Sequence, residues 1–566
     1  MPSKLASLLR SAIAATALMS AGLAAASSLS GAYLAGMQAD FRDDYAEAAS
    51  YYQRALETDP DNVGLMMNEV VARVAMDDVA GAKPIADRLD AADSGNQIAT
   101  LVRLADALAI GDFDQAAAIL GTAGEETINP LLGGLLAGWI EVGREDFAAA
   151  GARFDTMTGN DALAAYGQYH KALALAFAGD FVSAASILAG DEDGPLHLNR
   201  AAIVAHAEVL AQIGREDDAV ALLDEALAGG VPDAPIIALR DSLAAGAEVP
   251  FDAITRARDG AAEAFLTLAD ALNGEESQRV ALVHARLAAH IRPDLIEADL
   301  LAADILEAQG QYALATEALA GVPQDSPWYV TAQIHRADTQ RSAGDAEGGI
   351  ATLTALSQSA QDRIEVDSAL GDALRIAERF PESAQAYTRA IDKVETPREA
   401  HWVLYYTRGI ASERAGDWEG AEADFRKALE LRPDQPLVLN YLGYSMVEKQ
   451  ENLDEALGMI EAAVKGQPDD GYITDSLGWV LYRLGRYEEA VPHMLRAVEL
   501  TPEDPVINDH LGDVLWKVGR KREAEFQWRR ALSFGPAEDL DMDRVRKKLD
   551  VGLDAVLSGE KDSQEG

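Results

Sequence analysis

The sequence predicts an all-α fold built from stacked helix pairs, and two observations lead to this fold class. Apolar residues make up 49% of the 566 residues but aromatic residues only 6%, a composition that suits many closely packed helices. In addition, a set of glycine, alanine and proline positions recurs every 34 or 35 residues near the C-terminus. A fixed period of this length is typical of a repeat array rather than of several unrelated domains.

The repeat is clearest between residues 402 and 538. Leu-Gly pairs are followed at nearly constant distance by an alanine and by a closing proline. These positions are Leu442-Gly443, Leu477-Gly478 and Leu511-Gly512, then Ala456, Ala490 and Ala524, then Pro468, Pro502 and Pro536. A fourth unit precedes them, with Gly409, Ala421, Phe425, Ala428 and Pro433.

Each unit reads as two antiparallel amphipathic helices. We expect a turn between them at Gly416, Gly485 and Gly519, because glycine adopts the left-handed conformation that ends a helix. The other glycines and the alanines lie where the helices cross, since a large side chain there would force them apart. One pair cannot bury its apolar face alone, so each unit is stabilised by stacking on its neighbours.

These residues resemble the tetratricopeptide repeat: Leu-Gly, a large apolar residue, Ala, an aromatic residue or Leu, Ala and Pro. The resemblance implies a right-handed α-solenoid, or superhelix, of about fourteen units with a C-terminal capping helix. We expect the following order: an N-terminal array at 27–229, an irregular helical connector at 230–261, a degenerate central array at 262–401, the strong block at 402–538, the capping helix at 539–557 and a disordered tail at 558–566.

The first 26 residues predict a secretory signal peptide. Lys4 and Arg10 are their only charges, and an apolar stretch from Ser11 to Leu23 follows. An Ala-x-Ala processing site comes next, so we expect cleavage after Ala26 and a periplasmic product. Secretion is the alternative destination, and an alanine-rich first helix is the alternative interpretation of this segment.

Composition excludes several classes of function. With 94 acidic and 48 basic side chains the formal net charge is −46, which argues against a broad basic face for nucleic acids or anionic membranes. We interpret this charge as solvated outer faces, with a preference for basic partners as the alternative. The chain has no cysteine, and therefore no disulfide, thiol nucleophile or lipid anchor on a cysteine.

No motif for catalysis, a cofactor or a metal stands out. The sequence contains no HExxH, no phosphate-binding GxxxxGK loop and no GxSxG elbow. The repeats also occupy nearly the whole chain, and they leave no stretch of 100 residues for a catalytic domain. We therefore predict a protein that is not an enzyme; an active site hidden among the repeats is the alternative.

A solenoid of this type offers a concave groove lined by the first helix of each pair. In the strong block we expect positions 2, 5, 9, 12 and 13 of each repeat to face inward; the second position is Val403, Leu437, Tyr472 and Val506. Aromatic side chains beside polar ones are typical of interaction surfaces. The predicted partner-binding residues are Tyr406, Asn440, Tyr444, Tyr472, Asp475, Trp479, Tyr482, Arg483, Asp509, Asp513, Trp516 and Lys517. The alternative is that these aromatic groups stabilise neighbouring helices, as we expect of Trp418, Tyr487 and Trp528.

Basic residues also gather near the C-terminus. They run from Lys517 to Arg530 and continue at Arg544, Arg546, Lys547 and Lys548. They offset helix C-terminal dipoles or form a local docking patch.

The segments 440–444 and 475–486 also resemble a family of Gram-negative envelope tetratricopeptide proteins. A characterised type in that family is an outer-membrane lipoprotein adaptor that scaffolds a periplasmic carboxy-terminal processing protease and brings it substrates. The resemblance implies a non-catalytic scaffold with protein partners of this kind, although this chain lacks the lipidated cysteine. A cytosolic, co-chaperone-like peptide binder with an uncleaved leader is the alternative, and the oligomeric state stays open.

Overall fold

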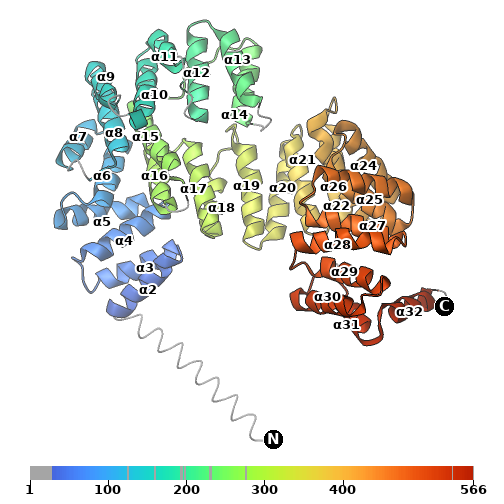
Figure 1. Ribbon diagram of the computed structural model, residues 1–566. Helices are drawn as coiled ribbons and strands as arrows, with labels where there is room; N and C mark the ends of the chain where they lie inside the picture. Colours follow the sequence, from blue (N-terminus) through green and yellow to red (C-terminus); the bar gives the residue numbers. More distant parts are fainter. Residues whose placement is uncertain are drawn as a thin grey trace, which may run out of the picture. The chain divides into compact units, whose positions relative to one another are not determined.

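The computed structural model describes residues 29–123, 127–157, 161–190, 196, 199–228, 233–274, 277–537 and 540–564. Over this part of the chain the regular secondary structure is helical, from α2 to α32, and contains no strand (Figure 1). The all-α prediction is therefore confirmed. The predicted signal peptide at 1–26 lies outside the described residues.

The chain divides into two compact units, residues 1–352 and 353–566. The first begins with six helix pairs: α2 (Leu29–Phe41) with α3 (Tyr45–Leu56), α4 (Val63–Ala75) with α5 (Val79–Ala92), α6 (Gln97–Ala109) with α7 (Phe113–Thr122), α8 (Pro130–Gly143) with α9 (Phe147–Thr156), α10 (Asp161–Phe177) with α11 (Phe181–Leu188), and α12 (Arg200–Gln212) with α13 (Glu216–Leu227). After the single helix α14 (Ala234–Ala244) come α15 (Ala257–Leu272), α16 (Gln278–Ile291), α17 (Ile296–Ala308), α18 (Tyr312–Ala320) and α19 (Tyr329–Ser342).

Helix α20 (Ala346–Ser359) spans the boundary between the units. The second unit continues with α21 (Ile364–Ile376), α22 (Phe380–Asp392), η2 (Glu399–His401), α23 (Trp402–Arg414), α24 (Trp418–Leu431), α25 (Pro436–Lys449), α26 (Leu453–Gly466), α27 (Gly471–Arg483), α28 (Tyr487–Leu500), α29 (Pro505–Lys517), α30 (Lys521–Phe534), α31 (Met542–Val551) and α32 (Leu553–Gln564). Among the described helices six pairs precede α14 and eight follow it, so fourteen pairs match the expected number.

A short turn joins the two helices of a repeat. Gly416, Gly485 and Gly519 adopt φ values of 87°, 76° and 79°, so the predicted left-handed turn is confirmed at all three. Where aspartate follows the glycine, it caps the next helix: the Asp417 side chain accepts a hydrogen bond from the Gly420 amide at 3.1 Å. The cap satisfies one of the free amide groups at the start of α24.

The two helices of a repeat cross closely at a glycine. In seven pairs this glycine faces a large side chain 16 or 17 positions later: Gly36 and Tyr52, Gly138 and Phe154, Gly371 and Tyr387, Gly409 and Phe425, Gly443 and Ile460, Gly478 and Met494, and Gly512 and Trp528. A Cβ on Gly512 would lie 2.3 Å from Nε1 of Trp528, so no larger residue fits without displacement. Trp528 is fully buried, which agrees with its predicted packing role.

In the first unit the chain folds back on itself. Helices α15 and α16 pack against α4, α6, α8 and α10, which are first helices of the N-terminal pairs (Figure 1). Gly260 of α15 lies against the buried Trp139 ring of α8, where a Cβ would be 2.2 Å from Cε2. Arg279 of α16 forms ion pairs with Asp40 at 3.0 Å and Asp43 at 2.5 Å. The chain's own helices therefore cover this inner face.

The expected connector at 230–261 lies inside the first unit, between the sixth helix pair and α15. It holds α14 and an irregular segment at 245–256 that leads into α15. The backbone amides of Asp252 and Ala253 donate to the buried Glu208 carboxylate of α12 at 3.2 and 3.1 Å. The proline-rich sequence indicated a break in the period, but it carried no sign that the next helices return to the array.

The C-terminal end also differs from expectation. One capping helix was predicted at 539–557 and a disordered tail at 558–566. The structure has two helices, α31 and α32, separated at Gly552, whose φ is 83°. Because α32 continues to Gln564, residues 558–564 of the predicted tail are helical.

Candidate functional site

In the second unit the first helices of successive repeats form an inner layer. α21 contacts α23, α25 contacts α27, and α27 contacts α29, whereas the second helices of neighbouring repeats do not approach one another as closely. Because the first helices lie closer together than the second helices, the stack is curved, and one face of each first helix lies on its inner side. The predicted groove residues lie on these helices.

Three large apolar side chains are exposed at the same register of this layer. Val403 in α23 is 43% exposed, Leu437 in α25 is 41% exposed and Tyr472 in α27 is 61% exposed. Each is the second residue of its helix. We call these three residues the apolar stripe. The stripe continues over three successive first helices, unlike exposed apolar residues that are scattered singly over a protein surface.

Trp479 forms the centre of an aromatic stack beside this stripe. Its ring centroid lies 4.8 Å from that of Tyr482 and 3.9 Å from that of His510. Its Nε1 donates to Glu448 of the preceding repeat at 3.0 Å, and Arg483 pairs with the same carboxylate at 2.8 Å. Trp479 and Arg483 are therefore half-buried residues held in fixed positions.

Tyr406 lies in a second aromatic cluster at the start of the block. Its ring packs against Trp402, Phe425 and Tyr441, with centroids 5.7, 6.1 and 6.1 Å away. Burial raises the pKa of its hydroxyl. Asn440 and Tyr444 are half-buried. The structure thus places the predicted Tyr406 mainly in repeat packing, which is the alternative that the sequence left open.

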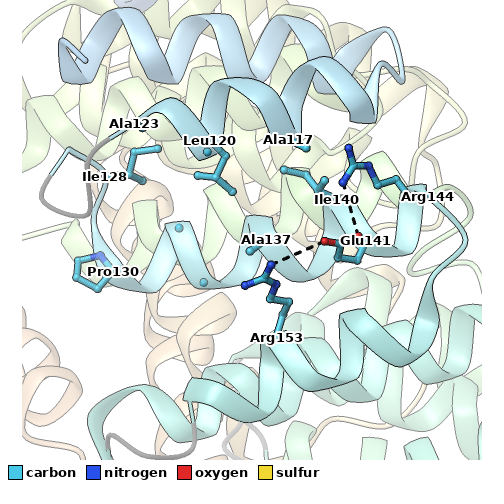
Figure 2. A pocket seen from close by; sticks show the side chains of 13 residues that line it. Ala117, Leu120, Ala123, Ile128, Pro130, Ala137, Ile140, Glu141, Arg144 and Arg153 are labelled. Atoms are coloured by element: carbon cyan, nitrogen blue, oxygen red, sulfur yellow. Dashed lines mark ion pairs between the residues drawn. The ribbon is translucent and has the colours of Figure 1, made fainter. Parts of the chain in front are cut away.

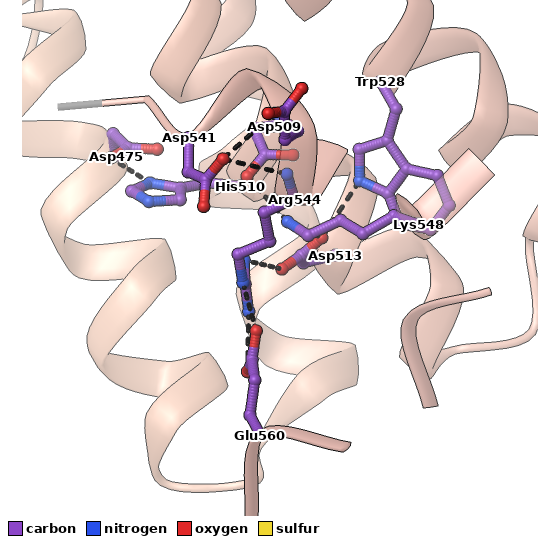
Figure 3. Close-up of polar contacts among 10 residues, drawn as sticks. Asp475, Asp509, His510, Asp513, Trp528, Asp541, Arg544, Lys548 and Glu560 are labelled. Carbon is purple, nitrogen blue, oxygen red and sulfur yellow. Dashed lines mark hydrogen bonds and ion pairs between the residues drawn. The ribbon is translucent and has the colours of Figure 1, made fainter. Parts of the chain in front are cut away.

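Four predicted groove residues are interior residues instead. Asp475, Tyr482, Asp509 and Asp513 are between 1% and 9% exposed. The three carboxylates belong to a polar cluster between α27, α29 and α31 (Figure 3). The prediction that these four residues are accessible to a partner is wrong. For Asp509 and Asp513 the reason is that α31 folds back over the last repeat and covers them.

Lys548 of α31 is the central cation of this cluster, and Arg544 lies 3.9 Å from Asp513 at its edge. It is fully buried, and its Nζ lies 2.7 Å from a carboxylate oxygen of Asp509 and 2.7 Å from one of Asp513 (Figure 3). The Trp528 indole also donates to Asp513 at 3.0 Å. Burial raises the pKa of Asp513 to about 6, although Lys548 opposes this shift.

His510 joins the cluster to the preceding repeat. Its Nδ1 lies 2.9 Å from an Asp475 carboxylate oxygen. Burial lowers the pKa of His510, but the Asp475 carboxylate, with Asp509 and Asp513 nearby, outweighs burial and leaves the pKa raised. When the ring is protonated, it forms a buried ion pair with Asp475 that joins two repeats.

The capping helix α32 holds two further predicted groove residues. Trp516 Nε1 donates to one Asp554 carboxylate oxygen at 2.9 Å, and Lys517 pairs with the other at 2.6 Å. Arg544 of α31 pairs with Glu560 of α32 at 2.8 Å. The C-terminal basic residues thus serve in part to dock the chain's own cap, so Lys548 is unavailable as a docking residue.

The first unit contains an open cavity that the sequence did not indicate. It has a volume of about 490 Å³ and lies among α7, α8 and α9 (Figure 2). Small and apolar residues line most of it, and Arg144 and Arg153 lie 3.8 and 4.0 Å from Glu141 at one end. A Cβ on Gly133 would meet only Ile128, at 3.8 Å. Gly133 therefore lines this cavity, whereas Gly138 packs against Phe154.

Two negative findings hold for the part of the chain that the structure describes. It contains no group of three His, Asp or Glu side chains that could hold a metal ion. None of its helices combines the length and apolar character needed to cross a membrane.

Family models for the tetratricopeptide repeat match three segments, residues 42–107, 402–435 and 448–505. The chain therefore contains tetratricopeptide repeats near both ends, as the sequence pattern indicated. Proteins built from such repeats generally act as non-catalytic scaffolds for protein–protein interaction.

One curated relative is a TPR repeat-containing protein of Pseudomonas aeruginosa, 38% identical over 87 residues. The match covers 15% of this chain and 15% of that protein. Among solved structures, a tetratricopeptide repeat protein from Parabacteroides merdae is 16% identical, with a TM-score of 0.37, over 46% of this chain and 98% of that one. The Cut9–Hcn1 hetero-tetramer of the APC/C is 14% identical, with a TM-score of 0.37, over 93% and 97% of the two chains.

Proposed function

We propose that this protein is a non-catalytic scaffold that binds partner proteins on the inner layer of its second unit. The observation that carries this proposal is the apolar stripe, in which Val403, Leu437 and Tyr472 are exposed on three successive first helices. Helices pack about 8–10 Å apart, so the stripe presents an apolar group at about that interval. A segment in the polyproline II conformation rises about 3.1 Å per residue with three residues per turn, so it would present every third side chain to the stripe at about that interval.

Two half-buried residues beside the apolar stripe, Trp479 and Arg483, support the same proposal. Trp479 and Arg483 are already ordered by Glu448, so a partner that contacts their exposed edges loses little side-chain entropy on their account. Rigid aromatic residues next to arginine are typical of the residues that dominate binding energies. Of the predicted groove residues, Tyr472, Tyr444, Trp479 and Arg483 remain the best contacts.

The finer proposal concerns location and partner. The predicted leader at 1–26 supports export to the cell envelope, with a periplasmic scaffold as the product. The resemblance of residues 440–444 and 475–486 to envelope adaptors supports a carboxy-terminal processing protease and its substrates as partners. Binding both on one scaffold would raise their effective concentration near each other.

Partner capture from the native envelope, followed by crosslinking and mass spectrometry, tests the binding face. We expect the double variant Leu437→Ala with Tyr472→Ala to lose captured partner by about 30-fold, because two of the three stripe contacts contribute about 2 kcal/mol. Phe526→Ala is the matched control, since this side chain is 57% exposed on the second helix α30. Unchanged capture by a folded double variant would remove the stripe from the binding site.

Location and partner have separate readouts. N-terminal sequencing of the fractionated protein should give Ser27 in the periplasmic fraction, and an intact Met1 in the cytosol would contradict export. If the proteins captured from the envelope include no processing protease, the protease is not a partner, but the scaffold proposal is unaffected.

A further inference from the structure

The first helix of the array has an apolar outer face. Leu34, Met37 and Phe41 are 64%, 46% and 84% exposed, and Tyr33 beside them is 41% exposed. With Ser30, the exposed positions 30, 34, 37 and 41 are spaced by four, three and four residues. This spacing places them along one side of α2, as in the seam of two packed helices. We call Leu34, Met37 and Phe41, with Tyr33, the α2 seam.

The residue of α25 that is equivalent to Leu34 of the α2 seam packs against the preceding repeat. The glycine that meets the second helix is Gly36 in α2 and Gly443 in α25, so Leu34 corresponds to Tyr441. Tyr441 packs against Phe425 and Tyr406 of the preceding repeat, with ring centroids 5.1 and 6.1 Å away. The α2 seam therefore includes the position that stacks on a preceding repeat, and among the described residues no helix covers it.

The absence of charge on the α2 seam limits which kind of partner can bind there. The four seam residues are uncharged, whereas the chain as a whole carries −46. The one acidic residue of α2, Asp40, is paired with Arg279 at 3.0 Å. A charged partner would form no ion pair with the seam residues, whereas a second α2 seam of the same apolar composition would pack against them.

In the described part of the C-terminal end, the stacking face of the last repeat is already occupied, which disfavours a head-to-tail contact. There α31 and α32 cover the last repeat, and Lys548 is buried between Asp509 and Asp513. We therefore propose that two copies of this chain associate head to head, with α2 packed antiparallel on α2 of the other copy. Such a contact is isologous, so it closes as a dimer and does not grow into a filament.

The size of the seam predicts a weak dimer. A fully exposed side chain of this size presents about 150–250 Å², so the four residues offer roughly 450 Å² per copy. The total of roughly 900 Å² lies in the range of transient interfaces. We expect half-association at a concentration on the order of tens of micromolar. A dimer would double the number of partner-binding faces and add avidity.

Sedimentation velocity across a concentration series tests the dimer. We expect wild type to shift from monomer to dimer, and Leu34→Glu with Phe41→Glu to stay monomeric with unchanged helicity. Ile110→Glu is the matched control, because Ile110 is 71% exposed in the same unit but outside the seam, and it should dimerise like wild type. If both the full chain and the form that begins at Ser27 stay monomeric throughout the series, or if the dimer survives the double substitution, the proposal is overturned.

A crosslinking experiment locates the contact. Since the chain has no cysteine, Met37→Cys introduces a single thiol, and we expect a short bismaleimide to join two copies. Ile110→Cys should crosslink at least tenfold less, and equal yields would contradict the α2 contact. Both the full chain and the form that begins at Ser27 are measured. A full chain that stays monomeric while the shorter form dimerises supports the proposal and shows that the leader competes for the seam.

Discussion

Single residues set the spacing between the helices of a repeat. Gly512 allows α29 and α30 to cross at the Trp528 ring, and the same relation recurs at Gly36 with Tyr52 and at Gly409 with Phe425. The glycines were readable from the sequence because they recur with the period. The large partner 16 positions later follows from the same periodicity.

Gly512→Ala should lower the free energy of unfolding by about 1–3 kcal/mol, because the added Cβ would lie 2.3 Å from Nε1 of Trp528. Tryptophan fluorescence during denaturation measures it, since five of the seven tryptophans lie between Trp402 and Trp528. Gly458→Ala is the control: nothing lies within 4 Å of its Cβ position, so we expect a small gain from helix propensity. Equal effects of the two changes would contradict the close crossing.

His510 gives the second unit a pH-dependent contribution to stability. Its folded-state pKa is raised above the ordinary 6.5, so the contribution is fully present below about pH 6.5 and is lost as the pH rises through the folded-state pKa. His510→Gln should cost about 2 kcal/mol near pH 6 and less at pH 9, measured as the difference in melting temperature. Burial lowers the pKa of His493, so His493→Gln should show no such loss at pH 6. A cost that does not fall with pH would argue against the ion pair.

At the scale of elements, the two capping helices determine which groove residues are accessible. Asp554 of α32 engages Trp516 and Lys517, and Lys548 of α31 lies between Asp509 and Asp513. Sequence reasoning recognised the basic residues but could not pair them. The partners of Lys548 lie 35 and 39 positions earlier, and the partner of Lys517 lies 37 positions later, in each case on another helix. The aromatic and acidic pattern alone looks the same whether a partner or the chain itself covers it.

Lys548→Met should detach the cap, because it removes the ammonium group that lies 2.7 Å from both buried carboxylates, Asp509 and Asp513. We expect a loss of about 3–5 kcal/mol in the last repeat. Hydrogen exchange should show faster exchange in α29, α30 and α31. The adjacent Lys547→Met is the control, since Lys547 is exposed and its replacement should stay within about 0.5 kcal/mol. Unchanged exchange in α29 would show that Lys548 does not hold the cap.

At the scale of the whole molecule, the two units use the same repeat differently. In the first, α15 and α16 cover the inner face of the N-terminal pairs, and Trp139 lies at that contact. Its indole donates to Nδ1 of His170 at 2.9 Å, and burial lowers the pKa of His170 to about 3, so this histidine stays neutral. In the second unit the inner layer keeps an exposed apolar stripe. The proposed partner-binding face therefore lies in the second unit.

Trp139→Ala should cost about 3–5 kcal/mol and loosen two helices far apart in the sequence. We expect faster hydrogen exchange in both α8 and α15, because the tryptophan ring fills the space against Gly260. Ile110→Ala removes an exposed side chain of the same unit and should leave exchange in α15 unchanged. Faster exchange confined to α8 would contradict the fold-back as a stabilising contact.

The sequence by itself determined the all-α class, the helix pairs, their turns and the glycine crossings. These features depend on contacts within one period of 34 residues, and each leaves a repeated mark in the sequence. Only the tertiary structure decided that α15 and α16 cover the N-terminal inner face, that α31 and α32 cap the last repeat, and that Asp475, Asp509 and Asp513 are interior residues. Those contacts join segments that occur once in the chain, from tens to more than 200 residues apart, and a contact made once has no period from which it could be predicted.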